Sequence, residues 1–234
     1  MTRSGTRYSI MLFFVALATN GWADETNSHR STATVYDMVT PFLQGTTYVA
    51  ALDFEQGWTT QSNPNGVWSY GYSSGFSKRI TLYDQTAQPG IDEPNAQFWV
   101  SSSVNIGESP SVEFNNGPFY DDGIVDFGQD EFMLVAGSGG QYSDLVFTAP
   151  TDGAYQVWAG FRGDQYKIGA VVGVVVRGKL LFNSTVTAVG QGPQFNAIVR
   201  LKAGNKVVIS VGPGGVGGPQ RVGVDAGIIN MIKQ

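Results

Sequence analysis

The chain has 234 residues, no cysteine, 31 glycines and 14% charged residues, and its net charge is −5. The lack of cysteine excludes disulfide bridges, thiolate metal sites and cysteine catalysis. A negative net charge disfavours nucleic acid as a partner, because phosphate backbones attract basic surfaces. The composition, rich in Gly, Ser, Thr, Asn, Val and aromatic residues, is typical of strands and tight turns rather than of helices.

The N-terminal 23 residues have the pattern of a secretory signal peptide. Arg3 and Arg7 precede an apolar run over residues 10–18, and small residues lead to Ala23. The run is shorter than the roughly 20 residues of a membrane-spanning helix. We therefore expect cleavage after Ala23, with a retained membrane anchor as the alternative. Cleavage would change the net charge from −5 to −7. It would give a secreted, periplasmic or cell-surface protein without a transmembrane anchor.

Residues 24–45 are predicted to form a linker or short N-terminal segment, and residues 46–234 a single all-β domain. In the latter, short apolar runs alternate with turn signals such as Asn63-Pro64-Asn65-Gly66, and no helical period is evident. This spacing favours an antiparallel β-sandwich or barrel. The predicted strands cover residues 47–54, 67–72, 79–83, 97–101, 132–135, 142–148, 154–162, 168–176, 179–187, 195–201, 206–211 and 222–232.

Three sequence blocks together resemble a known kind of domain. They are NPNGVWSYG at 63–71, FTAPTDGAYQV at 147–157 and LKAGNKVVISVGPGG at 201–215. In this order they resemble a bacterial secreted jelly-roll domain found in exosortase-substrate and envelope proteins. That domain is similar to galactose-binding-like carbohydrate-binding modules. The resemblance covers residues 46–232 and implies a jelly-roll β-sandwich in an exported protein.

The chain departs from that family at several points. Residues 134–137 read LVAG where the family often has His-Pro-Gly, and Asn205 stands where it often has Asp. The sequence also shows no C-terminal anchor helix with a basic tail, so the exosortase sorting signal is missing. These departures leave the implied fold in place but put any histidine-dependent role of the relatives in doubt for this chain.

The resemblance also implies a structural calcium ion near the two ends of the domain. Asp53, Glu55 and Asp225 stand at the matching positions, and calcium prefers carboxylate and carbonyl oxygen ligands. The alternative is that these acids simply cap strand ends and turns. Apart from this ion, no cofactor is expected.

Polar strand faces that carry tryptophan suggest a ligand-binding surface. Side chains alternate between the two faces of a strand, so Gln156, Trp158 and Arg162 share one face. Sugar rings stack on aromatic side chains, and their hydroxyl groups need fixed donors and acceptors. The alternatives are that a second layer covers the tryptophans or that they form a protein interface. The candidate ligand-binding residues are Trp99, Trp158, Gln156, Arg162, Asn196 and Arg200.

No catalytic residue is predicted, because the only histidine, His29, lies in the polar N-terminal segment. We therefore expect an exported, non-catalytic carbohydrate-binding-like module whose partner is a glycan or cell-surface polysaccharide. The first alternative is a structural or interaction protein with a protein partner or self-association. The second is a carbohydrate-active enzyme that uses two carboxylates. Its candidate acids are Asp84, Asp92, Glu93, Glu108, Glu113, Asp121, Asp122, Asp126, Asp130 and Glu131.

Overall fold

The computed structural model describes residues 42–87, 95–103 and 109–233, which lie within one compact unit, Thr40–Gln234. The predicted signal peptide and residues 24–41 of the predicted linker lie outside the described residues. Strand β1 (Phe42–Val49) pairs antiparallel with the last strand, β16 (Gln220–Lys233). Residues 42–45, predicted as part of the linker, therefore already belong to the sandwich.

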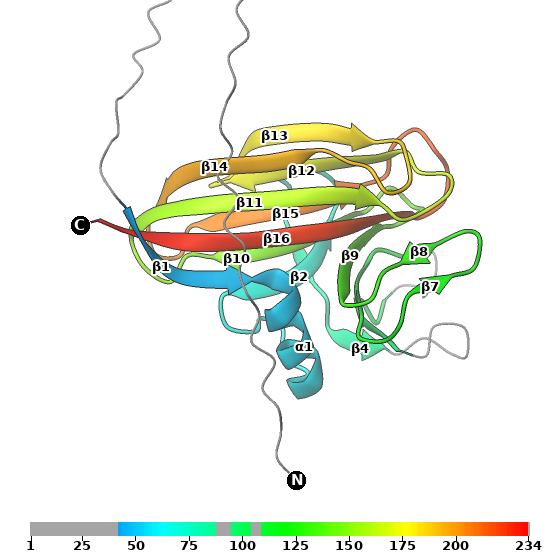
Figure 1. Ribbon diagram of the computed structural model, residues 1–234, viewed down its shortest axis with the longest axis horizontal. Helices are drawn as coiled ribbons and strands as arrows, with labels where there is room; N and C mark the ends of the chain where they lie inside the picture. Colours follow the sequence, from blue (N-terminus) through cyan, green and yellow to red (C-terminus); the bar gives the residue numbers. More distant parts are fainter. Residues whose placement is uncertain (1–41, 88–94, 104–108, 234) are drawn as a thin grey trace, which may run out of the picture. The chain divides into compact units, whose positions relative to one another are not determined.

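Two antiparallel sheets face each other, which confirms the predicted β-sandwich (Figure 1). Sheet A contains β1 and β16 together with β4 (Gln85–Ala87), β5 (Ala96–Val100), β6 (Ser111–Asn115), β9 (Glu131–Ala136), β11 (Gly153–Gly163) and β14 (Gln194–Leu201). Sheet B contains β2 (Trp68–Ser73), β3 (Thr81–Leu82), β10 (Tyr142–Thr148), β12 (Ala170–Val176), β13 (Lys179–Val186) and β15 (Lys206–Gly212). The strand order is β14-β11-β16-β9-β6-β5-β4 in sheet A, with β1 beside β16, and β13-β12-β15-β10-β2-β3 in sheet B.

The main core lies between the two sheets and follows from the alternation of apolar residues along each strand. On β11, Tyr155, Val157, Ala159 and Phe161 are buried, whereas the residues that alternate with them are partly exposed. Aromatic contacts join the sheets: the ring of Phe147 on β10 lies 5.8 Å from that of Tyr155. Burying such a side chain stabilises the fold by about 1.5–3 kcal/mol. The alternation predicted for residues 155–162 is therefore confirmed.

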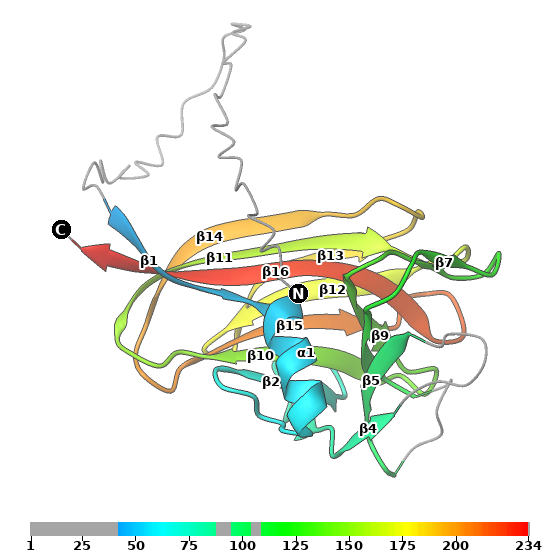
Figure 2. The same ribbon diagram turned by 60° about the horizontal axis from the view of Figure 1, so that its bottom comes forward.

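The segment after β1 is a helix, so the predicted strand over residues 47–54 is wrong in its second half. Helix α1 (Ala50–Thr60) contains Ala, Leu, Glu and Gln, which favour helix, and Asp53 lies in its first turn. Ala50 and Phe54, one turn apart, are buried in the core. The helix contacts β2 of sheet B and β5, β6, β9 and β16 of sheet A, and Figure 2 shows it beside β2. No helix among the described residues is long and apolar enough to span a membrane.

A second, smaller core covers part of the outer face of sheet A. The hairpin of β7 (Tyr120–Asp121) and β8 (Asp126–Phe127) follows β6 in the chain. None of these three strands was predicted from the sequence. Val125 and Phe127 pack with Phe98, Met133 and Val135 on the outer side of β5 and β9. The outer face is therefore covered over β5, β6 and β9, whereas residues facing outward from β11 and β14 remain at least partly exposed.

Candidate functional site

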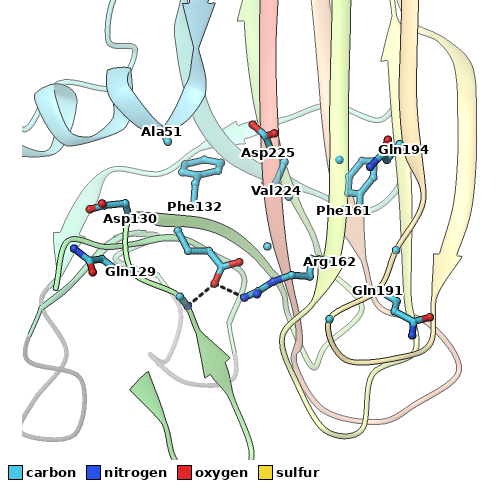
Figure 3. Close-up of a pocket in the computed structure, with 16 residues that line it drawn as sticks. Ala51, Gln129, Asp130, Phe132, Phe161, Arg162, Gln191, Gln194, Val224 and Asp225 are labelled. Atoms are coloured by element: carbon cyan, nitrogen blue, oxygen red, sulfur yellow. Dashed lines mark hydrogen bonds and ion pairs between the residues drawn. The ribbon is translucent and has the colours of Figure 1, made fainter. Parts of the chain in front are cut away.

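An open groove of about 770 Å³ lies where the cover on sheet A ends (Figure 3). It lies between residues 128–132 on one side and strands β11, β14 and β16 on the other. Gly160, Gly192 and Gly223 line it, so the backbone is accessible there. The polar lining side chains are Gln129, Asp130, Glu131, Arg162, Gln191, Gln194 and Asp225.

Arg162 is the centre of a charged cluster in the groove. Its Nη2 donates to Glu131 Oε2 at 2.6 Å, the contact drawn as a dashed line to Arg162 in Figure 3. Its Nε forms an ion pair with Asp164 Oδ1 at 2.7 Å. Nη2 also lies 3.9 Å from Asp126 Oδ1. These contacts fix the guanidinium while 38% of the Arg162 side chain stays exposed, so it can present its remaining N–H donors to a ligand.

The acids of the cluster are buried to different extents, and this determines their electrostatics. The Asp164 side chain is fully buried. Burial raises the pKa of Asp164, nearby Glu131 raises it further, and Arg162 opposes the shift. Burial also raises the pKa of Glu131, although its Oε2 accepts a hydrogen bond from the backbone N–H of Gly128 at 2.5 Å. One guanidinium therefore offsets two carboxylates that both resist ionisation.

Gly223 on β16 allows the two carboxylates to approach the sheet. A Cβ at this position would collide with Glu131 Oε1 and with Asp164 Oδ2. Gly223 pairs with Arg162 on β11 and with Met133 on β9, so it lies at the boundary of the outer cover. A residue without a side chain is needed here for the cluster to form.

The loop before β14 brings two glutamines to the groove. The Gly190 N–H donates to the Gly163 carbonyl at 2.9 Å, and the Gly163 N–H donates to the Gln191 carbonyl at 3.1 Å. These bonds hold the loop against the end of β11. They place Gln191 in the groove lining, with Gln194 close by at the start of β14.

Trp158 lies further along the outer face of β11, where its ring covers Gly227 of β16. It is partly exposed and pairs with the exposed Asn196 on β14. Gln156 Nε2 donates to Asn196 Oδ1 at 3.1 Å. Trp158, Gln156, Asn196, Arg162 and Arg200 therefore share one outer face. Arg200 lies near the far end of β14 and lines a different hollow.

Trp99 does not lie on this face, so its predicted exposure is wrong. Its side chain is only 2% exposed and belongs to the core between the sheets, where its ring stacks 6.4 Å from that of Tyr70. Both faces of β5 are covered, one by the opposite sheet and the other by the β7–β8 hairpin. Trp99 therefore contributes to stability and cannot stack on a sugar in this structure.

The predicted calcium ligands lie in different surroundings. Asp53 is partly buried and near Trp68, and burial raises its pKa. Asp225 is exposed on β16 opposite Gly160 and lines the groove. The side chain of Glu55 lies outside the described residues. Among the side chains described, no group of three His, Cys, Asp or Glu residues is arranged to hold a metal ion. The calcium site stays a prediction.

Two acids of the cluster, Glu131 and Asp164, are placed to position Arg162. A glycosidase needs one accessible proton donor and one accessible carboxylate. Asp164 is buried, and Glu131 is held by Gly128 and Arg162. What remains open to a ligand is a set of amide, carboxylate and guanidinium groups around a glycine-lined floor. Such a set can bind hydroxyl groups without covalent chemistry.

The fold and groove define this chain as an antiparallel β-sandwich protein with a polar cleft on its outer face. No family model matches the sequence, and no curated protein matches it. The structure is similar to the carbohydrate-binding module TmCBM27, studied for mannan recognition, at 8% identity and TM-score 0.38, covering 83% of this chain and 99% of that one.

Two clostridial modules are also similar in structure. One is a family 35 carbohydrate-binding module from Clostridium thermocellum, at 15% identity and TM-score 0.29, covering 57% of this chain and 87% of the module. The other is a CBM51 from Clostridium perfringens in complex with methyl-galactose, at 15% identity and TM-score 0.32, covering 68% and 99%. TM-scores below 0.5 are too low to transfer a ligand or a site to this chain.

The alternation of residues 155–162 predicted Arg162 on a polar face, but most residues of the groove were not predicted as a site. Asp130 and Glu131 appeared only among ten candidate acids, and Asp225 only as a calcium ligand. Gln191 and Gln194 were not among the candidate site residues. The glycines around Gln191 indicate a loop, but no local pattern shows that this loop returns to the end of β11.

Proposed function

We propose that this protein is a non-catalytic carbohydrate-binding module whose ligand lies in the groove beside Arg162. The observation that carries the proposal is an accessible, glycine-lined cleft whose exposed amide and carboxylate groups surround a fixed guanidinium. Sugar hydroxyl groups need many donors and acceptors held in place. The volume of about 770 Å³ lies within the range of small-ligand sites.

The charge of the groove favours a neutral sugar. Asp130, Glu131 and Asp225 line it together with a single cation, Arg162. A uronic or sialic acid would bring another negative charge to a surface that already has an excess of carboxylates. The partly exposed Trp158 lies two residues from Gly160 on the same face of β11. Its ring offers a stacking surface for a sugar unit that extends beyond the groove.

Export, and a place in the bacterial envelope or among secreted proteins, remain part of the proposal. They rest on the basic and apolar pattern of residues 1–23 and on the resemblance of the sequence to secreted jelly-roll domains. A glycan on the cell surface or in the surrounding medium would be the ligand encountered there.

The test is a glycan screen of residues 24–234, first with calcium and then with chelator, followed by titration of the best glycan. Gln194→Ala removes an exposed amide of the groove and should weaken binding roughly 3- to 10-fold, the effect of one hydrogen bond. The matched control is Gln85→Ala, an exposed glutamine on β4 at the other side of sheet A, and it should leave the affinity unchanged.

Two outcomes would contradict the proposal. If no glycan binds with calcium and none binds with chelator, the alternative of a structural or interaction protein would be favoured. Glycan binding that Gln194→Ala and Trp158→Ala both leave unchanged, with the fold intact, would place the ligand away from the groove.

A further inference from the structure

Charge is segregated along the second half of the chain. Residues 165–224 contain no Asp or Glu, although the protein as a whole is acidic. The same stretch contains seven basic residues: Lys167, Arg177, Lys179, Arg200, Lys202, Lys206 and Arg221. The fold gathers five of these, Arg177 to Lys206, near the turns that join β12 to β13 and β14 to β15.

The turn between β12 and β13 presents the first two cations. Arg177 and Gly178 have φ values of 52° and 77°, as in the two-residue hairpin turns that fit the twist of a sheet. Lys179 pairs with Val176 directly after the turn. The backbone N–H of Arg177 donates to the carbonyl of Lys206 at 2.9 Å, which ties this turn to the start of β15.

The end of β14 brings a third cation close to Arg177 and Lys179. Arg200 lines the same hollow of about 520 Å³ as Arg177 and Lys179, although it comes from the other sheet. All three cations are exposed, and none forms an ion pair with a described residue. Asp152 accepts a hydrogen bond from the N–H of Ala203 at 2.8 Å, so it offsets part of the charge near the β14–β15 turn.

Apolar side chains are exposed between these cations. Leu181 on β13 is 43% exposed and Ile198 on β14 is 52% exposed, and both line the hollow. The two strands are the edges of their sheets. A polar polymer would leave such side chains in contact with water, whereas a lipid surface would bury them while its headgroups meet the cations.

We infer that this basic edge, formed by Arg177, Lys179, Leu181, Ile198 and Arg200, docks on an anionic phospholipid surface. The groove beside Arg162 lies toward the other end of β11 and β14, because Gly160 pairs with Gln194 whereas Ala154 pairs with Arg200. Figure 1 shows β7 and β8, which lie next to the groove, at the end of the sandwich opposite the start of β13. A protein docked by the basic edge therefore keeps the groove away from the lipid.

Vesicle flotation tests this inference. The chain from residue 24 onward is used, because the apolar run at residues 10–18 would itself enter lipid. It should float with vesicles of phosphatidylglycerol mixed with phosphatidylcholine and not with phosphatidylcholine alone. Binding should weaken as salt is raised, since screening shortens the reach of the cations to about 8 Å at physiological ionic strength.

Two double variants distinguish the effect of the basic edge on vesicle binding from the effect of net charge. Lys179→Gln with Arg200→Gln should lower the partition coefficient about 25-fold, because each cation near an anionic surface contributes about fivefold. Lys78→Gln with Arg79→Gln makes the same change in net charge at two exposed residues before β3 and should leave binding unchanged. Ile198→Thr should lower it several-fold by removing apolar contact. Thermal unfolding checks that each variant is folded.

The result that overturns the inference is no flotation with phosphatidylglycerol vesicles at low salt. An equal loss in the two double variants would also overturn it, because net charge alone would then explain the binding. Retention of polygalacturonate or another soluble polyanion without vesicle binding would identify a polymer site instead.

Discussion

The carboxylate of Asp164 lies fully buried 2.7 Å from the guanidinium of Arg162, two residues earlier in the chain. At the other side of the guanidinium, Glu131 accepts a hydrogen bond from Nη2 at 2.6 Å. Arg162 is therefore both the partner of buried acids and a partly exposed donor in the groove. Stability and the proposed ligand binding therefore depend on the same side chain.

Arg162→Gln should destabilise the fold by about 2 kcal/mol, a value discounted because Arg162 is partly exposed. The variant leaves Glu131 and Asp164 without their cation, so the pKa values of both carboxyl groups should rise further. The folded state then favours the protonated acids, and the variant should lose stability as the pH rises. Urea denaturation at pH 5 and pH 8 measures this. A destabilisation of the same size at both values would contradict the electrostatic explanation.

Gly223→Ala should disrupt the cluster from the side of β16. The added methyl group meets both carboxylates, and overpacking of this kind costs about 1–3 kcal/mol. The control is Gly215→Ala, where a Cβ would have no neighbour within 4 Å. Denaturation midpoints of the two variants provide the comparison. Equal stability in both would mean that Glu131 and Asp164 move aside at no cost.

The two tryptophans should behave differently when shortened to alanine. Trp99→Ala empties a site in the core and should cost about 3–5 kcal/mol of stability. Trp158→Ala removes a partly exposed ring and should cost less stability but weaken glycan binding. Unfolding experiments together with glycan titration separate the two effects. The expectation fails if Trp158→Ala is as destabilising as Trp99→Ala.

Asp144 on β10 should make stability depend on pH. It is buried, accepts a hydrogen bond from Ser210 at 2.5 Å, and burial raises its pKa to about 6 from 3.8. The folded state therefore holds a proton that the unfolded state releases. This stabilising contribution is present below about pH 4 and is lost as the pH rises through 6.

Asp144→Asn removes the titrating group while keeping an acceptor for Ser210. The free energy of unfolding of the variant, relative to that of the natural protein, should rise by on the order of 2 kcal/mol as the pH goes from 4 to 7. Urea denaturation over this range measures the difference. A difference between the two proteins that does not change with pH would show that Asp144 does not titrate in this way.

The predicted calcium site can be tested without a glycan. If Asp53, Glu55 and Asp225 bind the ion, calcium should raise the unfolding temperature and a chelator should reverse the effect. Asp225→Asn should abolish this response. Asp121→Asn, a change at an exposed acid of the β7–β8 hairpin, is the control. If calcium does not change the unfolding temperature, the prediction of a stabilising calcium site is wrong.

The sequence by itself determined the class of fold and the facing of several strands. The period-two pattern of residues 155–162 correctly separated buried Tyr155 and Val157 from outward-facing Trp158 and Arg162. The predicted strands 168–176 and 179–187 left two residues between them, and the structure has a hairpin turn there, at Arg177 and Gly178. These features are local, because alternation and turn chemistry depend on neighbouring residues alone.

Tertiary structure decided what covers each face and which segments meet. The alternation of residues around Trp99 predicted an exposed polar face. In the structure its side chain points between the sheets, and the β7–β8 hairpin covers the other side of β5. Glu131, Arg162 and Gln191 come from separate segments. The pairing of β9 and β11 with β16 brings Glu131 and Arg162 together, and the hydrogen bonds of the loop to Gly163 bring Gln191 to the same groove. Helix α1 likewise interrupts a run that reads as a strand, because Ala50 and Phe54 bury one helical face in the core. Such contacts depend on long-range packing, which local patterns do not encode.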